Sequence, residues 1–221
     1  MNDIQFLTHG RIQLALHILC ENSEGPALLL LHGLGENSPA RLPDEYKNWP
    51  GPIYALDFTG HGQSTVPRAG GYTCEILIAD VDVALASIGP ATIVGRGLGG
   101  YIAVLIAGCR PELVKGVVIR DGTGLAGGGL GANSPYIGMP DVSQLITPPD
   151  PFAIVELATD VRPPDYVAEF VRLAGEFSEL SRPISVAACE RAPWLDAVVA
   201  EMGVEVSSLS EALKCYAEQS A

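Results

Sequence analysis

The chain has 221 residues and a formal net charge of −13 at pH 7; 48% of its residues are hydrophobic and 18% are charged. This composition predicts one folded domain with a small insertion and excludes a disordered chain. The acidity argues against nucleic acid or an anionic membrane as a partner, because both are bound through clustered lysine and arginine.

Strand patterns recur along the whole chain. Alternating apolar and polar residues on both sides of Thr8–Arg11 predict an antiparallel hairpin at the start. The later runs are continuously apolar, which is typical of strands buried on both faces of a parallel sheet. Strands are expected at residues 4–7, 12–19, 27–31, 52–56, 91–94, 114–119, 183–189 and 204–206.

Helix patterns lie between these strands. Thr73 has the side chain of an N-cap, and Ser208 and Glu211 have the spacing of a capping box. Helices are expected at residues 42–49, 73–88, 98–109, part of 157–180, 193–202 and 208–216.

The composition changes after residue 122. Residues 122–131 are rich in glycine, and residues 135–151 are rich in proline. A helical face then carries apolar side chains at Val167, Phe170, Val171, Ala174 and Phe177. We therefore expect a core domain of residues 1–122 and 181–221, with residues 123–180 as an insertion that caps the ends of the strands.

The alternation of strand and helix patterns predicts an α/β fold with a mostly parallel sheet, an antiparallel N-terminal hairpin and helices on both faces. In such folds the ligand crevice lies at the carboxyl ends of the strands. The loops after Leu31, Leu56, Val94, Ile119 and Cys189 are expected to converge there.

The five cysteines are scattered and lack the spacing of a metal site, so we expect free thiols, no metal and no cofactor. A reducing cytoplasm is the expected compartment, since the N-terminal residues lack the pattern of a signal peptide. The longest apolar runs, such as residues 102–107, are too short to cross a bilayer.

Four segments, in this order and spacing, resemble the α/β-hydrolase superfamily. Residues 29–34 (Leu-Leu-Leu-His-Gly-Leu) resemble its oxyanion loop, and residues 57–64 resemble its Asp-x-x-Gly-His-Gly-x-Ser turn. Residues 94–103 resemble the nucleophile elbow, a strand–turn–helix corner, and residues 183–194 resemble the strand and loop that deliver the acid. The resemblance implies the α/β-hydrolase fold with a small cap.

The same comparison implies that the catalytic triad is missing. The nucleophile position is Gly97, the acid position is Ala192, and Ser207 stands where the base histidine is expected. A triad needs a nucleophile, a base and an acid that orients the base. The positions are those of a degenerate triad, and we expect a pseudoenzyme without serine-hydrolase chemistry.

Several residues remain as candidates for a binding site. The amides of Leu34 and Leu98 are the expected oxyanion-hole donors, available to a carbonyl or anionic group. Gly97 either relieves backbone strain or enlarges the floor of the pocket. Arg96 either pairs with a buried acid or binds an anion. The remaining candidates, which are either structural or part of the crevice, are His32, Gly33, His61 and Asp121.

Two functions of different classes stay open. The first is a non-catalytic protein that binds a small molecule with a carbonyl or anionic group, or a protein partner. The second is a hydrolase or lyase that uses the oxyanion-hole amides with the crevice histidine, aspartate and arginine side chains. If the apolar face of residues 167–177 is exposed, a homodimer or scaffold is expected instead.

Overall fold

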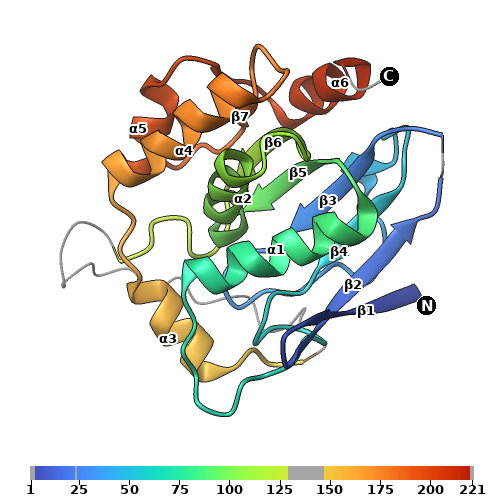
Figure 1. The fold of residues 1–221 in the computed structure, drawn as a ribbon, viewed down its shortest axis with the longest axis vertical. Helices are drawn as coiled ribbons and strands as arrows, with labels where there is room; N and C mark the ends of the chain where they lie inside the picture. The colour runs from blue at the N-terminus through green and yellow to red at the C-terminus, as the bar shows by residue number, and fades with distance from the viewer. Residues whose placement is uncertain (1–2, 23, 129–146, 220–221) are drawn as a thin grey trace.

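A single eight-stranded sheet forms the centre of the molecule (Figure 1). The computed structural model describes residues 3–22, 24–128 and 147–219. The strands are β1 (Asp3–His9), β2 (Ile12–Cys20), β3 (Ala27–Leu31), β4 (Ile53–Leu56), β5 (Ala91–Arg96), β6 (Val114–Arg120), β7 (Ile184–Val186) and β8 (Val204–Val206). Their order across the sheet is β1-β2-β4-β3-β5-β6-β7-β8.

The expected fold class is confirmed. β1 and β2 form the antiparallel hairpin, β2 also pairs antiparallel with β4, and the other neighbouring strands are parallel. This is the α/β-hydrolase fold, a mostly parallel sheet that begins with an antiparallel hairpin.

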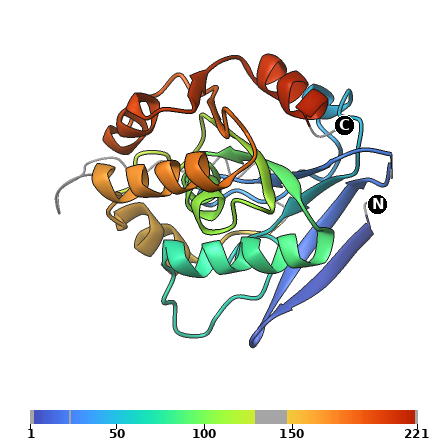
Figure 2. The same ribbon diagram turned by 45° about the horizontal axis from the view of Figure 1, so that its top comes forward.

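Helices cover the sheet unequally on its two faces (Figure 2). They are η1 (Asp44–Tyr46), α1 (Cys74–Ile88), α2 (Leu98–Cys109), α3 (Pro151–Thr159), α4 (Pro164–Phe177), α5 (Pro193–Ala200) and α6 (Leu209–Gln219). Alternation along β3 places Leu29 and Leu31 in the large core with α1 and α2. Leu28 and Leu30 instead pack in a smaller core with η1 and α6. The helix expected at residues 42–49 is only the single turn η1, so little helix covers this second face.

Helices α3 and α4 lie in the part of the chain expected as an insertion, residues 123–180. α4 packs against α2 and α5, with Val167, Val171 and Ala174 fully buried, so it flanks the sheet. Of the apolar side chains expected on this helix face, only Phe177 is exposed. Residues 129–146, which include most of the glycine- and proline-rich stretch, lie outside the described residues.

Helix α3 was not expected. It begins at a proline in its first turn, and the Asp150 side chain caps it by accepting a hydrogen bond from the amide of Phe152. Its capping residue is bound to the loop after β4, because the amide of Asp150 donates to the carbonyl of Gly60 and the hydroxyl of Tyr72 donates to the Asp150 carboxylate.

No helix in the described parts of the chain is long and apolar enough to cross a membrane.

Candidate functional site

The turn between β5 and α2 has the backbone of a nucleophile elbow. Gly97 sits between the strand and the helix with φ 53° and ψ −118°, a conformation that strongly favours glycine. Two residues on, α2 passes so close to β3 that a Cβ on Gly99 would lie 2.7 Å from the carbonyl oxygens of Leu31 and His32. The sequence thus forms the corner in which a hydrolase places its nucleophile, with no side chain on it.

A backbone carbonyl fills the expected oxyanion hole. The amides of Leu34 and Leu98 both donate to the carbonyl oxygen of Thr123, each at 3.0 Å. A Cβ added to Gly97 would lie 2.1 Å from the same oxygen. The interpretation that Gly97 enlarges the pocket floor is therefore wrong, because the backbone of Gly122 and Thr123 takes up that space.

A buried arginine holds the segment after Thr123 in place. The Nη1 atom of Arg162 donates to the carbonyls of Gly124 and, at 2.6 Å, Leu125. Its guanidinium lies 4.7 Å from the ring centroid of Tyr101, in the geometry of a cation–π contact. The indole of Trp194 also donates to the Leu125 carbonyl, at 2.7 Å. These contacts fix the chain that closes the oxyanion hole.

The two loop histidines are engaged in backbone hydrogen bonds. The Nε2 atom of His32 accepts from the amide of Phe58 at 3.1 Å, and that of His61 accepts from the amide of Gly35 at 3.1 Å. Both are therefore in the tautomer that carries its proton on Nδ1, which lies near a carbonyl of the same loop. Burial lowers the pKa of both, that of His61 to about 3. Neither lone pair is free to act as a base.

The carboxylates of the crevice loops are also engaged. Asp121 accepts from the amides of Cys189 and Glu190, at 2.9 and 2.8 Å. Gly33 donates its amide to Glu36 at 3.0 Å.

Asp57 is fully buried and accepts from His17 Nε2 at 2.9 Å and from the amides of Ser38 and Gln63. Burial alone would raise the pKa of Asp57, but its neighbours, above all the hydrogen bond from His17, bring this pKa down to about 2. His17 lies in the expected strand of residues 12–19, and the sequence gives no signal of this buried pair.

Ala192 and Ser207 stand at the positions that the resemblance assigns to the acid and the base. Ala192 is buried at the start of α5, and the amide of Ser207 donates to the carbonyl of Val186. The hydroxyl of Ser207 is buried without a hydrogen-bond partner among the described residues. The remaining histidine, His9, lies at the end of the edge strand β1 and pairs with Asp80, which also accepts from the amide and hydroxyl of Thr59.

Arg96 lines a cavity, and the elbow residue Gly97 does not. This cavity has a volume of about 220 Å³ and lies at the carboxyl ends of β3, β5 and β6, on the face covered by η1. Arg96 forms a two-pronged ion pair with Glu36, through Nε at 3.2 Å and Nη2 at 3.1 Å. Burial alone would raise the pKa of Glu36, but the bonds from Arg96 hold it below its ordinary value, so the pair is ionised.

Comparison with known proteins agrees with the fold. The model of the alpha/beta hydrolase family matches residues 28–212. Epoxide hydrolase 4 of Mus musculus is 31% identical over 134 residues, which cover 54% of this chain and 36% of that protein. The (E)-2-((N-methylformamido)methylene)succinate hydrolase of Acinetobacter baylyi is 31% identical over 104 residues, covering 46% and 40%. The matched part of this chain thus spans less than half of each relative.

Solved structures of similar length share the fold at low sequence identity. The thioesterase domain from the curacin biosynthetic pathway superposes with a TM-score of 0.67 and 14% identity, covering 100% of this chain and 96% of that one. A hypothetical protein, PA1622 of Pseudomonas aeruginosa, superposes with a TM-score of 0.65 and 16% identity, covering 98% and 97%.

Proposed function

We propose that this chain, which belongs to the alpha/beta hydrolase family, is a non-catalytic member that binds a small molecule. The observation that carries the proposal is the Thr123 carbonyl, which accepts both expected oxyanion-hole amides. An oxyanion hole stabilises a developing negative charge only if its donors point at the reacting oxygen. Here they point at a carbonyl of the protein itself.

The vacant triad positions support the same proposal. Gly97 and Ala192 carry no reactive group, and no histidine follows β8. Removal of a complete triad leaves a serine hydrolase with only the residual rate due to binding and oxyanion contacts. In this chain the oxyanion contacts are also occupied.

The enzyme hypothesis has less support. It requires a side chain that can exchange a proton in the crevice, and His32, His61 and Asp121 each use their acceptor atoms in loop hydrogen bonds. The hydrolase names of the relatives describe those proteins, and each relative is matched over less than half its length.

Incubation of the full chain with p-nitrophenyl acetate and butyrate tests the proposal. We expect hydrolysis no faster than the buffer blank and no labelling by a fluorophosphonate probe, with an active serine hydrolase as the positive control. Ester turnover that is lost in Leu98→Pro would overturn the proposal. Proline is tolerated in the first turn of a helix and removes the amide in question, together with the buried Leu98 side chain. A thermal melt of that variant shows whether it is folded.

A further inference from the structure

We infer that the cavity between the ends of β5 and β6 and the turn η1 binds a small carboxylate with an apolar body, of about the size of benzoate. The inference rests on the proposed binding function, but it places the ligand on the η1 face of the sheet and not at the elbow. Four kinds of feature carry it: paired arginines, surplus hydrogen-bond donors, an apolar floor and an exchangeable glutamate.

Two arginines reach the cavity from neighbouring strands. Arg96 and Arg120 are register partners at the carboxyl ends of β5 and β6, and both line the cavity. Register partners on parallel strands lie about 4.8 Å apart, with side chains on the same face. Two guanidinium groups that line one cavity repel each other, so the arrangement favours negative charge between them.

The two arginines of the cavity have hydrogen-bond donors to spare. Arg120 uses only Nη1, which donates to Glu45 and, at 2.7 Å, to the hydroxyl of Tyr46. In the described parts of the chain its Nε and Nη2 atoms have no hydrogen-bond partner, and neither has Nη1 of Arg96. The Tyr46 hydroxyl accepts from Arg120, which leaves its own proton to donate.

Ser38 adds an unpaired buried hydroxyl to the same wall. The residue lines the cavity and is 1% exposed, and its Oγ atom has no partner among the described residues. Buried hydroxyls in native proteins are normally hydrogen-bonded, and an exception calls for a missing partner. With the free guanidinium nitrogens, this hydroxyl indicates a ligand that accepts hydrogen bonds.

The floor of the cavity is apolar. It is formed by Leu30 of β3 and Val94 of β5, and Pro39 and Pro43 close its side. A volume of about 220 Å³ corresponds to about seven water molecules at roughly 30 Å³ each. It is smaller than the roughly 300–1,000 Å³ of sites for drug-sized ligands. The ligand is therefore a compact molecule with one apolar and one acidic end.

The two glutamates at the rim differ in how firmly they are held. Glu36 is 23% exposed and accepts from the Gly33 amide as well as from Arg96. Glu45 is 44% exposed and lies on the single turn η1, and among the described residues its carboxylate bonds only to Arg120. An exposed ion pair contributes only about 0.2–1 kcal/mol. A ligand carboxylate would therefore replace Glu45 on Arg120 and leave the Arg96–Glu36 pair intact.

Isothermal titration calorimetry on the full chain tests the inference, with benzoate as the probe and benzamide as its uncharged match. We expect benzoate to bind about tenfold more tightly than benzamide, and Arg120→Gln to weaken benzoate about tenfold, because a two-pronged charged contact is lost. Glu45→Gln removes the competing carboxylate and should tighten binding several-fold.

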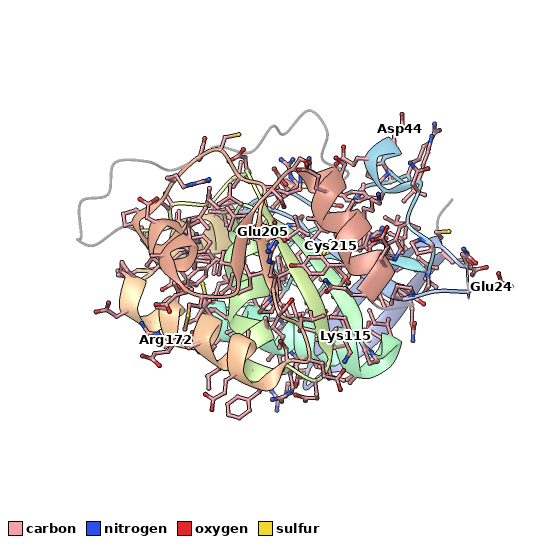
Figure 3. All side chains as sticks on the ribbon, turned by 90° about the horizontal axis from the view of Figure 1, so that it is seen from above. Glu24, Asp44, Lys115, Arg172, Glu205 and Cys215 are labelled. Atoms are coloured by element: carbon pink, nitrogen blue, oxygen red, sulfur yellow. The ribbon has the colours of Figure 1, made fainter. Side chains whose placement is uncertain are left out.

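Arg172→Gln is the matched control. Arg172 forms an ion pair with Glu201 on the surface of α4 and α5. It lies on the opposite side of the molecule from η1, which is marked by Asp44 in Figure 3. This variant should bind benzoate as the unmodified chain does.

Equal binding of benzoate by the unmodified chain and Arg120→Gln would overturn the inference. So would the absence of binding at millimolar benzoate in both the unmodified chain and Glu45→Gln. The ester assay separates this failure from that of the proposed function. Ester turnover with Arg120-dependent benzoate binding would refute only the non-catalytic role, whereas inert esters without benzoate binding would refute only this site.

Discussion

Replacing Gly97 with alanine tests whether the Thr123 carbonyl closes the elbow. The new Cβ would lie 2.1 Å from that oxygen and 2.5 Å from the carbonyl carbon of Gly122, so the backbone of the loop must move. Movement would break the hydrogen bonds from Leu34 and Leu98. A positive φ costs a non-glycine residue about 1–2 kcal/mol, and each lost hydrogen bond costs about 1 kcal/mol. We therefore expect a loss of about 3–4 kcal/mol in the free energy of unfolding.

Gly10→Ala is the control that isolates the contact from the strain. Gly10 has a similar φ of 60°, but a Cβ there would meet nothing within 4 Å. We expect this variant to lose only the strain energy of about 1–2 kcal/mol. Urea unfolding followed by tryptophan fluorescence measures both losses. The Gly97 variant should also melt roughly 6–16 °C lower, at about 2–4 °C per kcal/mol for a domain of this size. If both variants lose the same free energy of unfolding, the conclusion that the Thr123 carbonyl occupies the oxyanion hole is refuted.

Three further predictions concern buried polar groups. The pKa of Asp57 is about 2 in the folded chain and about 3.9 when unfolded, so its stabilising effect is present above pH ~4 and lost as the pH falls toward 2. Asp57→Asn should cost about 3 kcal/mol at neutral pH, and urea melts should show the deficit shrinking in acid; a deficit independent of pH would contradict this. Burial lowers the pKa of His61 to about 3, and the unfolded chain takes up the proton first below pH ~6.5, so this residue destabilises the fold in acid. Its ring NMR signals should not titrate between about pH 8 and 5, whereas a midpoint near 6.5 would refute the burial. Arg162→Met removes the donor to the carbonyls of Gly124 and Leu125 and should speed hydrogen exchange at the Leu98 amide. Unchanged exchange would show that Arg162 is not needed to hold the Thr123 carbonyl against that amide.

Most of the fold could be predicted because its signals are local. Apolar runs and glycine turns depend on a few neighbouring residues, and the motif order adds the strand sequence. Helix α3 was missed because it begins in the proline-rich stretch of residues 135–151, for which no helix was expected. Asp150 followed by Pro151 is in fact the signature of a helix start, and this signal was available.

The site was harder to predict because it depends on contacts between distant residues. The vacancy at Gly97 is visible in the sequence, but its closure by Thr123 depends on where a loop 26 residues later returns. Arg96 was a candidate, whereas Arg120 was not. Both follow an apolar strand, and only the register of β5 with β6 makes them neighbours. A search for charged residues at corresponding strand ends would have found the pair.

The strand order also constrains how the chain folds during synthesis. From β5 onward each new strand joins the sheet beside the one before it, always at the same edge. β6 ends at Arg120 and its outer neighbour β7 begins only at Ile184. At roughly 5–20 residues per second, translation of the intervening segment takes on the order of 3–13 seconds. Throughout that interval the nascent chain presents an unpaired parallel edge, which is a template for intermolecular association. Among the described strands, the interval after β6 is therefore the longest in which the growing edge of the sheet waits for its next strand.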